Sequence, residues 1–384
     1  MTSRISSAAF ADTKPHYDLL DGLRGVAALI VVWYHVHEGF AFASGAPIVG
    51  GLNHGYMAVD FFFILSGFVI GYAYDDRWKK GFTLGDFFKR RLIRLHPMIV
   101  MGAVLGLITF CLQGAVQWDG THIATSMIML ALLCALFFIP ATGTCYEIRG
   151  NGEMFPLNGP SWSLFFEYIG NILYALFIHR FSTRVLTVVT VVLGAALAAF
   201  AILDVSGYGN FGVGWTLDTV NFTGGALRML FPFSMGMLLS RKFKPKRVRG
   251  AFWICSAVLL ALFAVPYIPG GAPVSLNGIY ESVCIIIVFP VLVWLGASGV
   301  TTDRRSTAVC KFLGDISFPL YAVHYPFMYL FYSWLIKEEL YTLGETWHVV
   351  VCLYAWNVLV AWLCLKFYDE PLRRRLAARF IKKK

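Results

Sequence analysis

The sequence predicts an all-α polytopic membrane protein with about ten transmembrane helices, one further re-entrant or interfacial segment, and both termini in the cytoplasm. Three observations lead to this prediction. Charged residues make up 14% of the 384 residues, whereas a soluble domain has about 25%. Apolar runs about as long as a membrane-spanning helix recur along the whole chain. Basic residues cluster in the loops between these runs, as the positive-inside rule describes.

Eleven apolar segments carry the predicted helices. They are 20–38, 56–74, 97–114, 123–140, 161–179, 185–203, 222–240, 250–268, 278–298, 313–336 and 347–366. We assign residues 1–18 to a cytoplasmic N-terminal segment, 19–367 to one membrane domain, and 368–384 to a basic cytoplasmic tail. The first run is long enough to span, so a cleavable signal peptide is not expected. The net charge of +10 reflects the basic loops and requires no nucleic acid as a partner.

The loop charges set the expected orientation. The basic loops, which should face the cytoplasm together with the C-terminal tail, are 75–96, 241–249 and 299–311. The neutral or acidic loops, which should lie outside, are 39–55, 204–221, 267–277 and 337–346. Two cytoplasmic termini require an even number of crossings, yet there are eleven segments. From 161–179 onward, the loop charges require the chain to enter from outside. Two full crossings after the basic loop 75–96 would instead bring it back to the cytoplasm, so one of 97–114 and 123–140 should not cross fully.

Arg24 and His35 lie eleven residues apart on the first apolar segment. Eleven residues is almost three helical turns, so both side chains should lie on one face, about 16 Å apart along the axis. Ionisable groups inside an apolar helix are costly and commonly mark a functional site. The alternative is that His35 is a satisfied polar residue in a helix interface and that Arg24 snorkels to the cytoplasmic surface.

Asp60 should lie near the external end of the second helix, at the depth of His35. A carboxylate beside a histidine can fix the tautomer of the ring. His37 faces away from the Arg24 stripe, so we expect His35 to be the site residue, acting as a general base on an acceptor hydroxyl. Ser66, in ILSGF, lacks the GxSxG frame of a nucleophile elbow, so a protein nucleophile is not expected.

Arg91 and Arg94, in FFKRRLIRLHP, are three residues apart and should be neighbours on one helical face. Two guanidinium groups in this arrangement can bind phosphates bidentately. The alternative is that they anchor the helix at the cytoplasmic surface. Glu167, in NGPSWSLFFEYIGN, lies about two turns into its helix, where a carboxylate must be paired or line a wet cavity.

Arg228 lies inside the apolar run of the seventh segment and needs an anionic partner, either a carboxylate such as Glu167 or Asp60 or a substrate. Tyr321 and His324 are three residues apart on the tenth segment. Such a pair is either structural or part of a substrate pocket. We therefore treat these three residues as candidate lining of a pocket.

The predicted depths divide the candidate residues between the two sides of the membrane. Arg24 and the Arg91/Arg94 cluster lie toward the cytoplasm, whereas the catalytic candidates lie toward the outside: His35, Asp60 and Glu167. This layout suits a reaction that joins a cytoplasmic anionic ligand to an external acceptor. A secondary transporter of an anionic sugar or acyl compound is the alternative, although the sequence has no internal repeat of the kind common in transporters. A third alternative is an inactive assembly protein.

The assembled motifs resemble the acyltransferase-3 family of integral-membrane acyltransferases. The resemblance covers nearly the whole chain and runs, in order, through LDGLRGVAALIVVWYHV, VDFFFILSGFVIGY, FKRRLIRLHP, PSWSLFFEY, LGDISFPLYAVHYPF and YDEPLRRR. The arginine and histidine separated by ten residues, followed by FFFILSGF, form the most specific part of the resemblance.

The resemblance implies that an acyl group, commonly acetyl, passes from acyl-coenzyme A (acyl-CoA) to a hydroxyl of a carbohydrate or related acceptor. It implies donor binding by the matched arginines Arg24, Arg91 and Arg94. We expect the catalytic residues to be His35, Asp60 and Glu167. The co-substrate is acyl-CoA, no metal is expected, and the enzyme should lie in the bacterial inner membrane.

The acceptor stays open at this stage. It could be an exopolysaccharide, a lipopolysaccharide sugar, a peptidoglycan-related glycan, a lipid-linked precursor or a small molecule. Many family members carry an extra periplasmic hydrolase-like domain, and this chain is expected to end after its last helix and basic tail. A separate periplasmic partner protein therefore either completes the transfer or is not needed. Acetyl cannot be distinguished from succinyl or a longer acyl group by these motifs.

Overall fold

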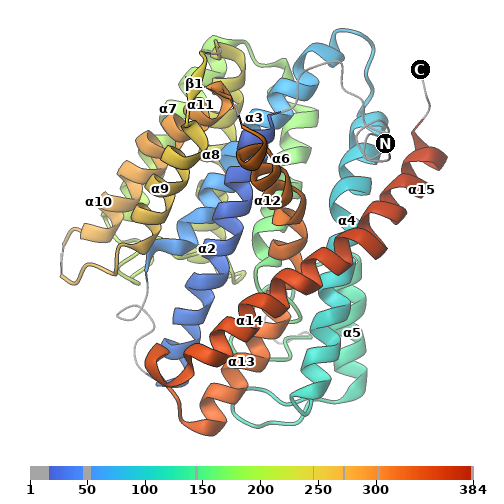
Figure 1. Cartoon of the computed structure of the whole chain (residues 1–384), viewed down its shortest axis with the longest axis vertical. Helices are drawn as coiled ribbons and strands as arrows, with labels where there is room; N and C mark the ends of the chain where they lie inside the picture. The colour runs from blue at the N-terminus through green and yellow to red at the C-terminus, as the bar shows by residue number, and fades with distance from the viewer. Residues whose placement is uncertain are drawn as a thin grey trace.

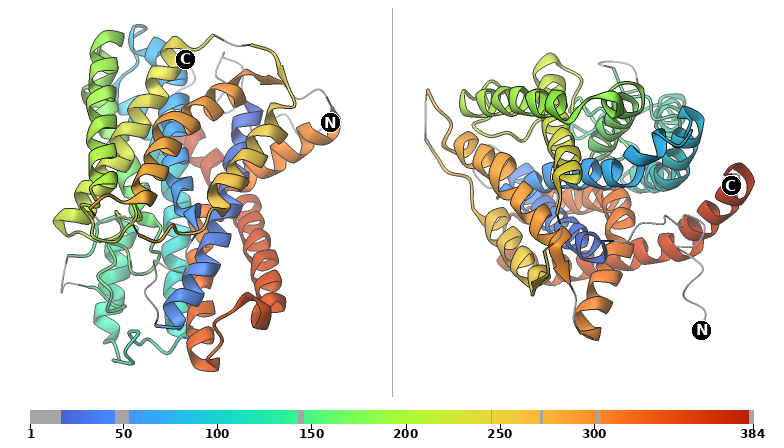
Figure 2. Two further views of the ribbon diagram at one scale, coloured as in Figure 1. Left: turned by 90° about the vertical axis from the view of Figure 1, so that its left-hand side faces the viewer. Right: turned by 90° about the horizontal axis from the view of Figure 1, so that it is seen from above.

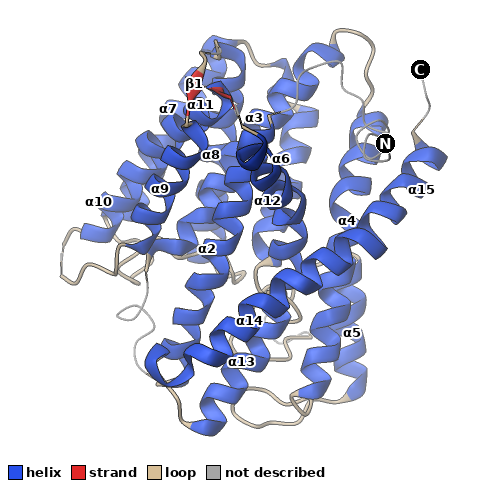
Figure 3. Ribbon diagram, in the orientation of Figure 1, coloured by secondary structure: helices blue, strands red, loops and turns tan. Residues whose placement is uncertain are grey.

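The computed structural model of the chain describes residues 17–45, 53–142, 146–244, 246–270, 273–300 and 303–381. Within this part of the chain nearly all regular structure is helical (Figure 3), apart from a short parallel pairing of β1 (Val248–Arg249) with β2 (Gly299–Val300). Seven stretches are long and apolar enough to cross a membrane: 18–43, 54–78, 84–112, 183–202, 219–242, 276–298 and 343–380. The predicted all-α membrane architecture is therefore confirmed. The number of crossings and the side of the termini stay predictions.

The helices follow the apolar segments along the chain. In the first part they are α2 (Asp18–Ala43), η2 (His54–Met57), α3 (Ala58–Trp78), α4 (Leu84–Leu112), α5 (Thr125–Leu136), α6 (Ser161–Leu176), η3 (Ile178–Arg180), α7 (Thr183–Ile202) and α8 (Thr219–Lys242). In the second part they are α9 (Ala251–Ala264), α10 (Leu276–Val283), η4 (Cys284–Val288), α11 (Phe289–Ser298), α12 (Arg304–Val323), α13 (Tyr325–Glu338), α14 (Leu343–Leu363), η5 (Cys364–Asp369) and α15 (Glu370–Phe380).

The pair α4 and α5 bears on the segment expected not to cross. α4 has 29 residues, and a capping box of Thr83 and Asp86 fixes its start. α5 has only 12 residues, a length of about 18 Å, whereas the apolar core of a bilayer is about 30 Å thick. The two helices pack against each other at the lower end of the molecule in Figure 1. α5 is the shorter of the two helices, and that it is the segment that does not span stays a prediction.

α2 lies inside the bundle and contacts α3, α9, α11, α12 and α13 (Figures 1 and 2). Glycines allow its neighbourhood to pack closely. A Cβ atom on Gly25 would lie 2.3 Å from the carbonyl oxygen of Leu313 in α12. A Cβ atom on Gly67 of α3 would lie 2.0 Å from the carbonyl oxygen of Phe233 in α8. Such close backbone approach is the usual way in which helices associate in lipid.

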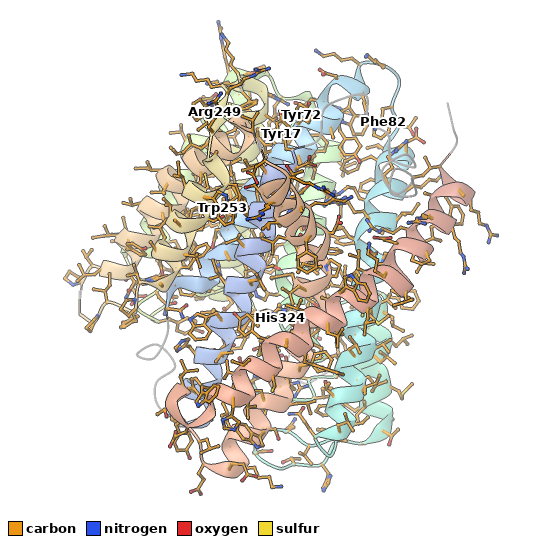
Figure 4. All side chains as sticks on the ribbon, in the orientation of Figure 1. Tyr17, Tyr72, Phe82, Arg249, Trp253 and His324 are labelled. Atoms are coloured by element: carbon orange, nitrogen blue, oxygen red, sulfur yellow. The ribbon has the colours of Figure 1, made fainter. Side chains whose placement is uncertain are left out.

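A break between α12 and α13 lies at His324, which Figure 4 labels near the middle of the molecule. Pro326 has no backbone N–H, so it cannot donate to the carbonyl of Ala322 one turn earlier. Asn158 fills this role, because its side-chain amide donates to Ala322 O at 2.8 Å. The break therefore ties the loop before α6 to the α12–α13 junction.

The ends of the helices sort by charge as the sequence predicts. The loop that follows α3, marked by Phe82, and the segment before α9, marked by Arg249, lie at the same end of the molecule as Tyr17 at the start of α2 (Figure 4). The basic loops thus gather at one end together with the N-terminal side of α2. We keep the assignment of this end to the cytoplasm as a prediction.

Candidate active site

Two cavities follow α2, one near each of its predicted site residues. The first, which we call the basic cavity, has a volume of about 80 Å³, and its polar lining besides Tyr321 is Arg24, Ser66, Arg91, Arg94, Ser163, Glu167 and Ser317. The second, which we call the aromatic cavity, has a volume of about 200 Å³ and is lined by ten aromatic residues besides His35, Glu38, Glu153 and Arg228. Val59 and Tyr321 line both cavities. The predicted Arg24–His35 face therefore borders two adjoining spaces.

The imidazole of His35 is held by Glu38, one helical turn later on α2. The distance from His35 Nδ1 to Glu38 Oε2 is 2.7 Å. An ionised carboxylate only accepts hydrogen bonds, so this contact places the proton on Nδ1 and leaves a lone pair on Nε2. Glu38 also accepts hydrogen bonds from the hydroxyls of Tyr332, at 2.8 Å, and Tyr325, at 3.2 Å. The carboxylate is thus fixed on several sides and orients the ring.

The expected pairing of Asp60 with His35 is wrong, because Asp60 pairs with Arg228. Arg228 Nη2 lies 2.7 Å from Asp60 Oδ2, and Arg228 Nε lies 3.1 Å from Asp60 Oδ1. Arg228 also donates to the carbonyls of Tyr56 and Val213. Both charged side chains are almost fully buried, with 0% of Asp60 and 1% of Arg228 exposed. In such surroundings the guanidinium is the strongest available partner for the carboxylate. Arg228 has the anionic partner that the sequence required.

In the basic cavity, Glu167 meets Arg91 rather than His35. Arg91 Nη2 donates to Glu167 Oε1 at 2.6 Å, and the Ser66 hydroxyl donates to the same oxygen at 2.9 Å. Arg24 pairs with Asp21 at 2.7 Å, one turn before it on α2. The structure thus brings the three expected donor-binding arginines to one cavity and places Glu167 among them. The expected position of Glu167 toward the other side, with His35, is not what the structure shows.

Tyr321 and His324 occupy different positions relative to the cavities. The Tyr321 hydroxyl lies 2.5 Å from Ser163 Oγ, and the ring lies at the wall that the cavities share. His324 is fully buried, and the centre of its ring lies 5.3 Å from that of His35. Its Nδ1 donates to the carbonyls of Leu320 and Tyr321, which anchors the helix break. Tyr321 therefore remains a pocket residue, while His324 lines neither cavity and packs against the ring of His35.

The loop before α6 supplies part of the aromatic cavity that the sequence analysis did not identify. Asn151 and Glu153 line it together with Trp118 and Tyr329. Asn151 Nδ2 donates to Glu153 Oε1 at 2.8 Å, and the Tyr329 hydroxyl donates to Glu153 Oε2. Burial raises the pKa of Glu153 to about 7. Glu38 was missed as well, although its spacing of three residues from His35 indicates a shared face.

The chemistry available at the site does not include a protein metal centre among the described residues. No group of three or more His, Cys, Asp or Glu side chains in that part of the chain could hold a metal ion. The arginines offer binding to an anion, and the His35–Glu38 pair offers a general base. A basic cavity beside a cavity with a positioned imidazole is the arrangement expected of a group-transfer enzyme that uses an anionic donor.

Comparison with known proteins identifies the family. The sequence profile described as "Acyltransferase domain" matches residues 17–366, and the chain therefore belongs to this acyltransferase family. "Protein 2 in picA locus" of Rhizobium radiobacter is 37% identical over 193 residues, which is 47% of this chain and 95% of that protein. "Acyltransferase MdmB" of Streptomyces mycarofaciens is 26% identical over 80% of this chain and 77% of its own length. No solved structure matches.

The chain also matches longer proteins. "Peptidoglycan O-acetyltransferase OatA" of Listeria monocytogenes is 24% identical over 381 residues, 94% of this chain and 56% of its own. This chain thus spans a little more than half the length of that relative. The family assignment confirms the resemblance seen in the motifs.

Proposed function

We propose that this protein is a membrane O-acyltransferase that moves an acyl group, acetyl in the first instance, from cytoplasmic acyl-CoA to a hydroxyl of an envelope or exported glycan. The name of the Listeria relative supports acetyl transfer to a glycan. The basic loops support an inner-membrane protein with both termini inside and ten crossings, in which residues 19–367 form the catalytic domain. Neither a specific acceptor nor a periplasmic partner protein follows from these observations.

One observation carries the proposal. Arg24, Arg91 and Arg94 line the basic cavity, His35 lines the aromatic cavity, and the two cavities share Val59 and Tyr321. Coenzyme A carries several phosphate charges, which guanidinium groups bind well. The pantetheine arm can then extend along α2 toward His35 and place the thioester at the junction of the cavities. Two substrates could therefore meet without crossing the membrane.

The proposed reaction is a direct transfer. The Nε2 lone pair of His35 takes the proton of the acceptor hydroxyl while the hydroxyl oxygen attacks the thioester carbonyl. The new C–O bond forms, the C–S bond breaks, and the leaving thiolate of coenzyme A takes the proton from the imidazolium. Glu38 stabilises the imidazolium through its hydrogen bond to Nδ1. Atoms and charge balance without a metal or a covalent enzyme intermediate.

The test compares His35→Ala with His37→Ala in protein reconstituted into lipid nanodiscs. His37 lies two residues away and contacts Trp33 and Phe40 instead of lining either cavity. We measure thiol release from acetyl-CoA and label transfer to membrane glycans supplied as acceptor. His35→Ala should abolish both signals in a folded protein, and His37→Ala should retain them. Full activity of His35→Ala would refute the mechanism, and substrate flux into liposomes without thiol release would favour the transporter.

A further inference from the structure

The charges around the aromatic cavity differ sharply from those around the basic cavity. Apart from tyrosines, its ionisable lining consists of His35, Glu38, Glu153 and Arg228. The one guanidinium among these is already paired with Asp60. Arg149 does not line the cavity, and its guanidinium lies 3.3 Å from the centre of the Tyr329 ring. Arg149 Nη2 has no hydrogen-bond partner, but Arg149 lies outside the lining. An anionic ligand in this cavity would therefore meet two carboxylates and no unpaired guanidinium among the lining residues.

Polar atoms at one side of the cavity lack a partner in the fold. Trp118 Nε1 and Asn151 Oδ1 are buried and make no hydrogen bond. Buried polar atoms are nearly always hydrogen-bonded, so an unpaired donor and an unpaired acceptor on two lining residues call for an explanation. A sugar hydroxyl offers both a donor and an acceptor and can satisfy either atom. Glu153 is held by hydrogen bonds from Asn151 and Tyr329, and its carboxylate can accept a further hydrogen bond from a sugar hydroxyl.

The size and surface of the cavity limit what it can hold. Its volume of about 200 Å³ is below the roughly 300–1,000 Å³ of pockets that enclose a drug-sized ligand. The lining is mainly aromatic, which offers flat apolar faces with hydroxyl groups at their edges. A single sugar ring suits this space, whereas a longer glycan must extend out of it.

We propose that the aromatic cavity is the acceptor subsite and that it takes a single uncharged sugar ring, bound through Trp118, Asn151 and Glu153. Acceptors that carry a carboxylate or phosphate on that ring are excluded, because they place like charges next to Glu38 and Glu153 without a free cation. This inference rests on the proposed function and adds the substrate class. The enzyme therefore separates its ligands by charge, with the polyanionic donor on one side of Tyr321 and a neutral acceptor on the other.

The experiment uses matched pairs of soluble acceptors with the nanodisc enzyme and labelled acetyl-CoA, at about pH 8 so that Glu153, whose pKa is raised to about 7, is ionised. The pairs are methyl β-glucopyranoside with methyl β-glucuronide, and methyl β-galactopyranoside with methyl β-galacturonide. We expect kcat/KM for at least one neutral glycoside to exceed that of its uronide by about 100-fold or more. Equal or better use of the uronides would overturn the proposal.

Failure of this inference can be told apart from failure of the proposed function. Transfer to native membrane glycans with no transfer to any neutral glycoside would overturn the single-ring subsite while leaving the acyltransferase intact. No transfer to any glycan, native or soluble, would instead refute the proposed function.

Variants test the residues named. Trp118→Phe removes the indole N–H and keeps a smaller aromatic ring. It should raise KM for the neutral glycoside about tenfold, with kcat little changed, because a lost hydrogen bond of about 1–1.5 kcal/mol corresponds to that factor. Glu153→Gln should reduce the discrimination against the uronide by at least about tenfold. Glu338→Gln, at an exposed position at the end of α13, is the control and should match the parent. The assignment of these residues to the acceptor subsite would be overturned if Trp118→Phe kept the parent's KM for the neutral glycoside and Glu153→Gln kept the parent's preference over the uronide.

Discussion

Replacing Glu38 with glutamine tests how His35 is positioned. The amide keeps nearly the same shape and can still accept the proton of Nδ1, but it removes the negative charge that stabilises the imidazolium. A hydrogen bond to a charged group contributes about 1.5–3 kcal/mol, which corresponds to about a 10- to 150-fold loss of kcat. The 2.7 Å contact and the hydroxyls of Tyr325 and Tyr332 place Glu38 in the upper part of this range.

The assay is thiol release from acetyl-CoA at saturating acceptor, with KM for acetyl-CoA measured in parallel. Because Glu38 does not line the basic cavity, KM for acetyl-CoA should stay within about twofold while kcat falls. A purely structural role would lower the amount of folded protein and leave kcat per folded molecule unchanged, which a thermal unfolding curve reveals. A folded Glu38→Gln variant with kcat within twofold of the parent would refute the reasoning.

Three further predictions concern the other charged groups. Arg94→Ala should raise KM for acetyl-CoA about 10-fold or more through loss of a phosphate contact, while Arg375→Ala on exposed α15 should not; equal KM values in steady-state kinetics would contradict this. Asp60→Asn should destabilise the protein by about 3–5 kcal/mol because it leaves the Arg228 charge buried and unpaired, and thermal unfolding close to the parent would count against it. The raised pKa of Glu153, about 7, means that its contribution to stability is present below about pH 4.5 and is lost as the pH rises through 7. The melting temperature of the parent should therefore fall relative to that of Glu153→Gln as the pH rises from about 4.5 to 7. A difference that does not change with pH would contradict this titration.

The helices could be predicted because hydropathy is a local property. Each of the eleven apolar segments coincides with helical structure, and the shortness of α5 agrees with the mismatch in the crossing count. The arginines that line the basic cavity could be identified in the same way, since a guanidinium in or beside an apolar run is conspicuous. Position along a helix predicted depth less well, because Glu167, expected on the side of His35, lines the basic cavity with Arg91.

The sequence offered Asp60 only as one of several partners for Arg228, and it did not indicate the partners of the other charges, because pairing depends on how helices rotate against one another. The sequence predicts Asp60 and His35 at one depth, which suggests contact, yet Asp60 faces Arg228 on α8. Glu167 likewise faces Arg91 on α4. The His35–Glu38 and Arg24–Asp21 contacts are local, each three residues apart on α2, and both could have been found from the spacing alone.

The sequence did not indicate that the loop before α6 contributes to the site. Glu153 meets Tyr329 across 176 positions of the chain, and Asn158 meets Ala322 across 164. Such contacts leave no periodic pattern in a single sequence. The part of the site that we assign to the acceptor is therefore visible only once the helices are assembled.

The central claim is that the donor enters through the basic cavity and presents its acyl carbon to His35. A structure of the protein bound to a non-hydrolysable thioether analogue of acetyl-CoA tests this most directly. The account predicts phosphates against Arg91 and Arg94 and the acyl carbon near the Tyr321 junction, with space for an acceptor oxygen between it and His35 Nε2, about 3–3.5 Å from the carbon. An analogue whose acyl end lies in lipid, or whose phosphates bind away from both arginines, would contradict it.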